Sequence, residues 1–418
     1  MVQWYRFLPS DKARSNPGIF IDRAGKFIRE NLSSDERVVC LVSGGVDSGV
    51  VAALFDLEIG ERLYPVHIDT GFMRLINGKE ESDMVAEHFS DMSNFAKLDA
   101  KNLFYQKIFF LSDAEEKRIA FREGYKEVAE KSVTMKLDVK PNVLAQGTIA
   151  LDIEETPTIK TQQNVNVPFG EKVEKVIEPL AGLCKNEVRK VAKKLFNLYG
   201  YKFLENYKRQ PFPGPGLSVR IVGAINKEKL EVERKANDIV EREIEKYMKE
   251  TYGDVMIIDP QTDEQIPFQY FAATFESSYT KSERISQLIK NEWKGEAKAK
   301  ILMQKATGMV EKKRVYKNVL CVYGTGEEEY KLLKEKGKTL PSRTDCSRLL
   351  YGLAQGDYKA LHSIAIRCVR SVNARTAEIL EIPLDRLRAI GEKIIKECDA
   401  SDVYYDISGK PPATIEYE

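Results

Sequence analysis

The stretch SGGVDS (Ser43–Ser48) places small residues, two hydroxyl groups and one carboxylate directly after an apolar run. The run Val38–Val42 is typical of a strand buried on both faces, and the apolar residues up to Phe55 are typical of a helix. Small residues let backbone N–H groups approach an anion, and a helix N-terminus adds a partial positive charge. The stretch therefore predicts a phosphate-binding loop between a strand and a helix.

The carboxylate of Asp47 distinguishes this loop from the common P-loop, which carries a lysine after its second glycine; no lysine follows Gly45. A carboxylate repels phosphate, so Asp47 suits the loop if it holds a Mg²⁺ ion that bridges to the phosphates. Such a loop would grip a leaving pyrophosphate instead of transferring a terminal phosphoryl group. The alternative is an ordinary strand-to-helix turn that Asp47 caps.

Strand and helix patterns alternate around this loop. We predict strands at 62–69 and 142–147, and helices at 18–32, 48–55, 80–89 and 112–132. This alternation indicates an α/β doubly wound domain with a parallel sheet. His67, inside the second predicted strand, is predicted to be structural.

A stretch rich in proline and glycine, Pro211–Gly216, excludes regular structure and marks a domain boundary. We therefore predict one domain over 1–208 and a second, α+β domain over 209–418, with a helix at 227–250. No internal repeat is apparent in the sequence.

The 418 residues carry 65 basic and 64 acidic side chains, which argues against a surface that coats nucleic acid. Three histidines and no close cysteine pair argue against structural zinc. No run of 18 apolar residues occurs, so we expect a cytoplasmic protein without a membrane contact. The segment 281–340 carries 15 Lys and Arg against 8 Glu; a solvated face is the simpler interpretation, and a contact with RNA is the alternative.

Several stretches resemble a known family. SGGVDS is the signature of the ATP-pyrophosphatase (PP-loop) superfamily, whose members split ATP between its α and β phosphates. Further stretches resemble motifs of the GMP synthetase family: HIDTGFMR (67–74), LAQGT (144–148), IKTQQNV (159–165), RQPFPGPGLSVRIVG (209–223) and YDISGKPPATIEYE (405–418). The last two are nearly identical to the family's motifs. The resemblance covers residues 15–275 and 356–418.

The resemblance implies a PP-loop ATP-pyrophosphatase domain followed by a dimerisation domain, in a ligase of purine biosynthesis. ATP would adenylate XMP with the help of Mg²⁺, and ammonia would displace AMP to give GMP. The implied catalytic residues are Lys160 and Asp47, which is also the metal ligand. The implied ATP-binding residues are Ser43, Gly44, Gly45, Val46, Asp47, Ser48, Ile68 and Gly147. The implied acceptor-nucleotide residues are Arg209, Pro211, Lys410, Thr414, Ile415 and Glu416.

The sequence departs from the family pattern in three ways. Few residues precede the first strand, so we expect ammonia from a separate glutaminase subunit or from solution. The lid motif carries Gln162 and Gln163 in place of a histidine pair. Residues 276–355 are inserted into the second domain, and a surface elaboration or added interface is the simpler interpretation. The resemblance also implies a homodimer through the second domain.

Two other functions stay open. The lid and the insertion would also suit a divergent paralogue that adenylates a different purine nucleotide or uses another amine or sulfur nucleophile. A non-catalytic nucleotide sensor or RNA-binding adaptor on the same fold is the alternative of a different class. Intact Asp47 and Lys160 count against the sensor.

Overall fold

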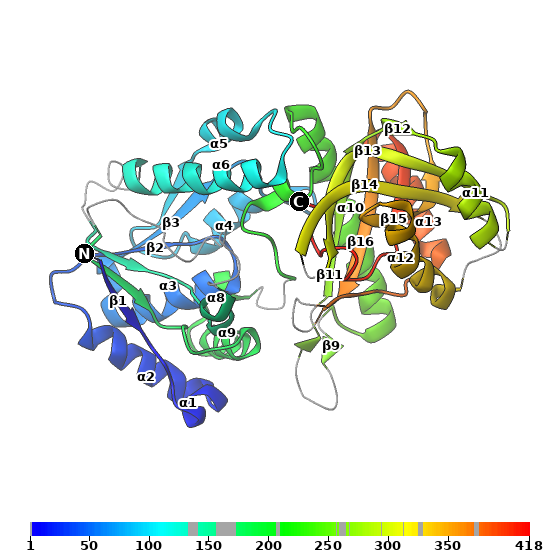
Figure 1. Ribbon diagram of the computed structural model, residues 1–418. Coiled ribbons are helices and arrows are strands. Elements are labelled where there is room, and N and C mark those ends of the chain that lie inside the picture. Colours follow the sequence, from blue (N-terminus) through cyan, green and yellow to red (C-terminus); the bar gives the residue numbers. More distant parts are fainter. Residues whose placement is uncertain are drawn as a thin grey trace. The chain divides into compact units, whose positions relative to one another are not determined.

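The computed structural model (Figure 1) describes residues 2–132, 141–155, 173–205, 210–255, 257–258, 265–266, 268–293, 295–311, 313–324, 329–371 and 376–418. Lys160, Gln162, Gln163 and Arg209, which were predicted from the sequence to matter, lie outside these residues. The chain divides into two compact units. The first contains residues 1–73, 79–107 and 118–214, and the second contains 74–78, 108–117 and 215–418.

Two short segments of the second unit precede the predicted boundary at residue 209. Segment 74–78 is held by Arg74, whose Nη1 lies 2.6 Å from Glu241 Oε1. Segment 108–117 is held by the Phe110 N–H, which donates to the Ile225 carbonyl oxygen (2.8 Å). The second unit is thus assembled from distant parts of the chain, which a single boundary in the sequence does not describe.

The first unit is built on a six-stranded sheet in the order β1-β8-β7-β2-β3-β6 (Figure 1). Its strands are β1 (Gln3–Arg6), β2 (Val38–Leu41), β3 (Leu63–Asp69), β6 (Ala96–Asp99), β7 (Val143–Ala145) and β8 (Lys175–Glu178). Every pairing is parallel, which confirms the doubly wound α/β prediction. The chain runs from β2 to β3 and β6 on one side and later to β7 and β8 on the other. The carboxyl end of β2 is therefore a topological switch point, where such sheets bind ligands.

The helices up to residue 199 are α1 (Asp11–Ser15), α2 (Pro17–Glu30), α3 (Val46–Ile59), α4 (Glu81–Phe89), α5 (Lys101–Ile108), α6 (Ala114–Glu127), α8 (Ala150–Glu155) and α9 (Lys185–Tyr199). Residues 49–55 of α3 are all buried, so this helix is a central part of the core. It is longer than the predicted 48–55 because Gly45 and Gly60 take the two cap positions. Among the described residues, no helix combines the length and apolar character needed to cross a bilayer.

The second unit is built on a mixed eight-stranded sheet with the order β11-β16-β18-β15-β14-β13-β12, and β17 (Glu378–Ile379) pairs with β16. The strands on the main path are β11 (Phe268–Glu276), β12 (Tyr279–Thr280), β13 (Ala297–Val310), β14 (Lys313–Gly324), β15 (Arg348–Gln355), β16 (His362–Arg370) and β18 (Ala400–Asp406). The helices are α10 (Lys227–Tyr252), α11 (Glu283–Glu292), α12 (Tyr330–Thr344) and α13 (Leu384–Cys398). Two small hairpins pair β4 (Leu75–Ile76) with β5 (Lys79–Glu80) and β9 (Ile257–Ile258) with β10 (Gln265–Ile266). This mixture of helices and antiparallel strands confirms the α+β prediction.

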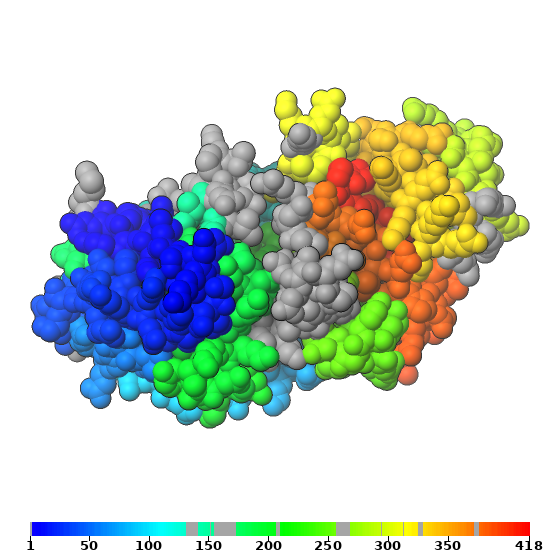
Figure 2. Space-filling view, turned by 90° about the horizontal axis from the view of Figure 1, so that it is seen from below, coloured from blue at the N-terminus to red at the C-terminus, as the bar shows by residue number. Residues whose placement is uncertain are grey.

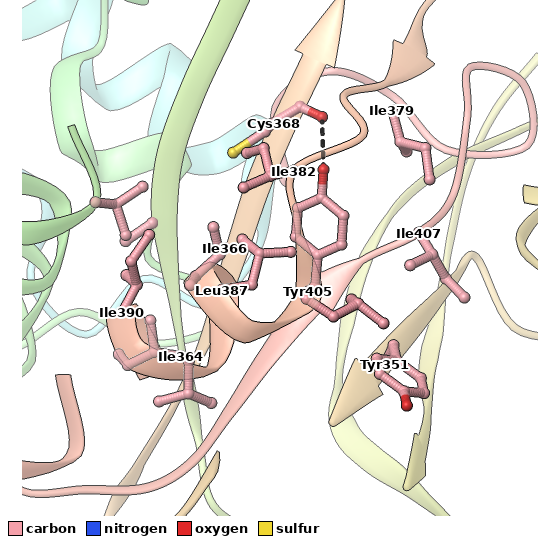
Figure 3. Packing of buried hydrophobic residues seen from close by; sticks show 14 of the residues in the cluster. Tyr351, Ile364, Ile366, Cys368, Ile379, Ile382, Leu387, Ile390, Tyr405 and Ile407 are labelled. Atoms are coloured by element: carbon pink, nitrogen blue, oxygen red, sulfur yellow. Dashed lines mark hydrogen bonds between the residues drawn. The ribbon is translucent and has the colours of Figure 1, made fainter. Parts of the chain in front are cut away.

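The interpretation of residues 276–355 as a surface elaboration is wrong. This segment supplies β12 to β15, α11 and α12, and it forms one half of the eight-stranded sheet. Leu320 and Leu349 are fully buried, and Tyr351 lies in the same core as Ile364 and Tyr405 (Figure 3). The many exposed lysines of these elements made the segment look like a surface in composition, although the same elements also have a buried apolar face.

Candidate nucleotide site

The SGGVDS loop joins β2 to α3 at the switch point of the first sheet. Gly44 has a φ of +77°, a left-handed conformation that glycine adopts without strain. A Cβ atom at this position would lie 2.5 Å from Cγ2 of Val85 on α4, which is closer than ordinary contacts allow. Backbone conformation and space therefore both require glycine here.

Hydrogen bonds within the loop hold its shape. The Ser48 hydroxyl donates to the Gly45 carbonyl oxygen (3.1 Å) and accepts from the Ser43 N–H (3.3 Å). The Gly45 N–H donates to Ser43 Oγ (3.3 Å). Because α3 begins at Val46, the N–H groups of its first turn have no carbonyl acceptor within the helix. The loop thus presents N–H donors and a partial positive charge to an anion.

The two carboxylate oxygens of Asp47 have different surroundings. Oδ2 lies 2.5 Å from Nζ of Lys185, whereas Oδ1 is buried and accepts no hydrogen bond from the described residues. A buried carboxylate oxygen beside phosphate-binding backbone is a suitable Mg²⁺ ligand. Within the described part of the chain, no group of three or more His, Cys, Asp or Glu side chains could hold a metal ion. A metal at Asp47 would therefore take most of its ligands from phosphate oxygens and water.

Two basic side chains of α9 lie near Asp47, and neither was predicted as a site residue. Lys185 is the first residue of α9, and Arg189 follows one turn later on the same side. Burial lowers the pKa of the Arg189 guanidinium, and the charge of Asp47 acts in the opposite direction. The pair was visible in the sequence as Lys and Arg four residues apart, soon after a strand.

Gly147 follows β7, the strand that pairs with β2. A Cβ atom at Gly147 would lie 3.2 Å from the carbonyl carbon of Asp47 and 3.2 Å from the backbone nitrogen of Ser48. The next residue, Thr148, donates a hydrogen bond to Glu178 at the end of β8. The structure thus brings Gly147 against the backbone of the phosphate loop.

The end of β3 lies beside the end of β2. The Ile68 side chain is buried, so a nucleotide at this point would meet its backbone. The Asp69 carboxylate lies 3.2 Å from Nζ of Lys97 and 3.3 Å from Nζ of Lys101. Burial alone would raise the pKa of Asp69, but hydrogen bonds and the two lysine charges hold it below its usual range. Asp69 therefore carries a charge that is already paired.

His67 has the structural role that we predicted. Its Nδ1 lies 2.8 Å from the Val42 carbonyl oxygen, and its Nε2 lies 2.9 Å from Ser82 Oγ. Burial lowers the pKa of His67, which favours the neutral ring. The imidazole therefore links the end of β2 to α4.

Three predicted acceptor residues meet in the second unit, in the segment that follows β18. Arg348 Nη2 donates to Thr414 Oγ1 (2.8 Å), and Arg220 Nε donates to Glu416 Oε2 (3.2 Å). Ile415 between them packs into the hydrophobic core. The chain's own arginines thus fix the conformation of this segment.

Two other predicted acceptor residues, Lys410 and Pro211, lie among the described residues. Lys410 is half-buried, and its backbone N–H donates to the Ala377 carbonyl oxygen (2.8 Å). Pro211 is half-buried in a stretch without regular structure, as predicted, and it belongs to the first unit. Lys160 and Arg209 lie outside the described residues.

A buried charge cluster that was not predicted lies beneath the final segment. The Asp406 carboxylate lies 2.8 Å from Arg348 Nη1 and 3.1 Å from Arg367 Nη1, and it accepts the Tyr417 hydroxyl (2.8 Å). Burial would raise the pKa of Asp406, but the two arginines hold it below its usual range. This cluster gives a structural role to Arg348, which was not predicted as a functional residue from the sequence.

Two family models match the chain. The model described as "GMP synthase C terminal domain" matches residues 352–417, and the model described as "Thiamine biosynthesis protein (ThiI)" matches residues 33–199. The B subunit of the glutamine-hydrolyzing GMP synthase from Saccharolobus solfataricus is 35% identical over 411 residues, covering 96% of this chain and 100% of the relative. The same subunit from Methanocaldococcus jannaschii is 34% identical, covering 96% of this chain and 99% of the relative.

The chain belongs to the family of GMP synthase B subunits. Membership confirms the resemblance that the sequence motifs indicated, and with it the class of ATP-pyrophosphatase-type ligases. Among solved structures, an NAD+ synthetase from Burkholderia pseudomallei matches 50% of the chain at 19% identity with a TM-score of 0.33, which is too low to carry an argument.

Proposed function

We propose that this protein aminates XMP to GMP in purine biosynthesis at the expense of ATP, which it splits into AMP and pyrophosphate. The observation that carries this proposal is the SGGVDS loop, in which Asp47 Oδ2 pairs with Lys185 while Oδ1 accepts no hydrogen bond from the described residues. The chain that contains this loop belongs to the family of GMP synthase B subunits. The xanthine C2 oxygen would attack the α-phosphorus, and the bond to the β-phosphate would break. Ammonia would then add at C2, and AMP and a proton would leave.

The chain's own residues supply positioning and charge neutralisation for these steps. The N–H groups at the start of α3 would hold the leaving pyrophosphate, and Lys185 and Arg189 would balance its negative charge. Asp47 would hold a Mg²⁺ ion, whose positive charge would further neutralise the phosphates. Lys160, outside the described residues, is proposed to reach the same phosphates.

The acceptor nucleotide is proposed to bind Arg209, Pro211 and the segment that contains Lys410, Thr414, Ile415 and Glu416. Intrachain bonds already fix the conformation of Thr414 and Glu416. Pre-organised groups lose little conformational entropy when a ligand arrives, which favours binding. Lys410 would act as a point charge for the nucleotide's phosphate.

Ammonia is proposed to come from a separate glutaminase subunit. The relatives from Saccharolobus solfataricus and Sulfurisphaera tokodaii are named as the B subunit of a glutamine-hydrolyzing enzyme. We propose that this chain is the corresponding cytoplasmic synthetase subunit, and that high ammonium concentrations can replace its partner.

The direct test mixes the protein with ATP, Mg²⁺, XMP and ammonium at high pH and separates the nucleotides by chromatography. We expect equal amounts of GMP and AMP, a strong loss in Asp47→Ala, and normal activity in Asp22→Ala, whose carboxylate is exposed on α2. AMP release with a different purine nucleotide or another nucleophile would instead identify the paralogue. ATP binding without AMP release from any acceptor would identify the non-catalytic sensor.

A further inference from the structure

The second unit contains the same arrangement of elements twice. In one set, β11 pairs antiparallel with β16, α13 follows, and β18 returns parallel to β16. In the other set, β13 pairs antiparallel with β14, α12 follows, and β15 returns parallel to β14. β18 and β15 then pair antiparallel at the centre of the sheet. Apart from the short strands β12 and β17, the order of pairings is therefore the same when it is read outward from the centre on either side, as a twofold axis between β18 and β15 requires.

The helices and the turns after them agree in detail. α12 (Tyr330–Thr344) and α13 (Leu384–Cys398) each have 15 residues, and corresponding residues are 54 apart in the chain. Each helix ends at an aspartate in the left-handed conformation, Asp345 with a φ of 57° and Asp399 with a φ of 51°. At the same offset the sequence repeats several residue types: Leu333 and Leu387, Gly337 and Gly391, Ser347 and Ser401, Tyr351 and Tyr405.

Hydrogen bonds from equivalent tyrosines support the repeat. The Tyr351 hydroxyl donates to the carbonyl oxygen of Gly324 on β14 (3.0 Å). The Tyr405 hydroxyl lies 3.5 Å from the carbonyl oxygen of Cys368 on β16 and 2.5 Å from that of Leu380, which is its nearer acceptor. Gly324 and Cys368 occupy the same register relative to their tyrosines, because Val322 pairs with Tyr351 as Ile366 pairs with Tyr405 (Figure 3). The contact of each tyrosine with the neighbouring strand thus has a counterpart in the other copy.

Packing across the centre is reciprocal. Gly337 on α12 lies against the backbone of Ile407, which follows β18, so that a Cβ atom there would overlap the Ile407 carbonyl. Gly391 on α13 lies against Leu353, near the end of β15, at 3.4 Å from Cβ to Cβ. Leu353 and Ile407 are again 54 residues apart. Each helix therefore has a glycine that lies against a segment of the other copy.

The second copy also holds the final segment of the chain. The Thr307 N–H and hydroxyl of β13 both donate to the Tyr417 carbonyl oxygen (2.8 and 2.7 Å), and the Met309 N–H donates to that of Pro412 (2.6 Å). Arg348 of β15 adds its bond to Thr414. In Figure 2 the red C-terminal atoms are bordered by yellow and orange surface of the same unit.

We infer that residues 297–355 are a second copy of the module formed by β11, β16, α13 and β18, and that this copy, not a second chain, completes the acceptor site. Thr307 and Arg348 are its positioning residues. A lone module would leave β18 as an open strand edge, which needs a partner. Here β15 fills that edge within the chain, so the acceptor segment does not require the homodimer that the resemblance implied.

The inference about acceptor binding rests on the proposed function, whereas the inference about the fold does not. The segment after β18 continues to residue 418, but the segment after β15 returns within six residues to β16 as loop 356–361. Only one copy therefore carries an acceptor segment, and we expect one XMP site per chain.

The first test measures three properties of the full-length protein over a dilution series. These are its mass by light scattering, the hydrogen exchange of residues 412–417 and the KM for XMP. We expect the mass of one chain, 47.6 kDa, and values of exchange and KM that do not depend on protein concentration. The inference would be overturned if the protein were a dimer that dissociates on dilution, and if residues 412–417 then exchanged hydrogen faster and the KM for XMP rose.

The second test replaces Thr307 by Val, which removes the hydroxyl but keeps the shape. Loss of one such hydrogen bond corresponds to about a three- to tenfold rise in the KM for XMP, with an unchanged KM for ATP and faster exchange at 412–417. Thr307→Ser should restore both values, and Thr280→Val on exposed β12 should change neither. Unchanged exchange in Thr307→Val would overturn the inference. If the wild type makes no GMP, the proposed function fails, and the exchange data alone decide the role of the second copy.

Discussion

At the scale of single residues, the conformation of the phosphate loop depends on glycines as much as on charged side chains. Gly44 and Gly147 leave room for Val85 and for the backbone of Asp47, respectively. Asp47 in turn pairs one oxygen with Lys185 and leaves the other without a donor among the described residues. A nucleotide that enters this site thus meets a loop whose shape is already set by packing.

Gly44→Ala is expected to lower the free energy of unfolding by about 2 to 4 kcal/mol. The left-handed backbone strains an L-residue by about 1 to 2 kcal/mol, and overlap with Val85 adds a packing penalty of similar size. The loop must shift to relieve the overlap, so the affinity for ATP should also fall. Urea denaturation measures the first effect, and titration calorimetry measures the second.

Gly78 offers a matched control, because its φ is also +77° and no atom lies within 4 Å of its would-be Cβ. Gly78→Ala should show only the backbone strain and should leave ATP affinity unchanged. Adding Val85→Ala to Gly44→Ala should recover part of the lost affinity. Equal losses of ATP affinity in the two glycine variants would contradict the role assigned to Val85.

The sequence motifs were sufficient to select Asp47, Gly147 and the loop at residues 43–48, which the structure brings together. Their roles in binding ATP and a metal ion stay predictions. The sequence was not sufficient for Lys185, which comes from α9 and reaches Asp47 only when β8 has brought α9 into place. A lysine at the start of a helix has many ordinary roles. Its function here is decided by a partner that lies far away in the chain.

At the scale of elements, α12 and α13 are equivalent in position but not in tightness of packing. Gly337 touches the Ile407 backbone directly, whereas Gly391 faces the side chains of Ala354 and Leu353. The backbone of an adjacent strand cannot move as easily as a side chain. The contact of Gly337 therefore tolerates a larger side chain less well than the equivalent contact of Gly391.

Gly337→Ala should lower the free energy of unfolding by about 2 to 3 kcal/mol, since overpacking against rigid backbone outweighs the gain of about 1 kcal/mol in helix propensity. Gly391→Ala should be close to neutral, because its new Cβ would lie 3.2 Å from that of Ala354 and the two effects nearly cancel. Urea denaturation of both variants gives the comparison. A larger loss in Gly391→Ala than in Gly337→Ala would contradict the packing described for the two helices.

The repeat itself could not be predicted from the sequence. The second copy is inserted between β11 and β16 of the first, so the two sequences do not follow one another in the chain. The offset between copies also changes, from 44 residues between Val322 and Ile366 to 54 between Tyr351 and Tyr405, because a longer connection precedes α13. Few residue types coincide, and only the shared strand pairing shows how to align them.

At the scale of the whole molecule, the inserted copy lets a single chain pair the edge of β18 and hold its own final segment. Residues 402–406 of β18 pair with β15, and arginines of both copies hold the final segment. Arg348 from one copy donates to Thr414 Oγ1, and Arg367 from the other donates to the Thr414 carbonyl oxygen (2.8 Å each). Both edges of the central strand pair are therefore closed within one chain. Twofold symmetry, which usually requires two subunits, is obtained here within one chain.

Removing the inserted copy tests this organisation. Glu276 and His362 lie opposite one another in the pairing of β11 with β16, so a short turn can join them after residues 277–361 are deleted. The shortened chain keeps β18 but loses its partner β15, and an exposed apolar strand edge favours pairing with another chain. We expect a dimer by light scattering, in which β18 pairs antiparallel with β18 of a second chain and Arg367 still neutralises Asp406. If the shortened chain instead folds as a stable monomer at high concentration, the β18 edge does not need the inserted copy, and the copy must have been retained for another reason.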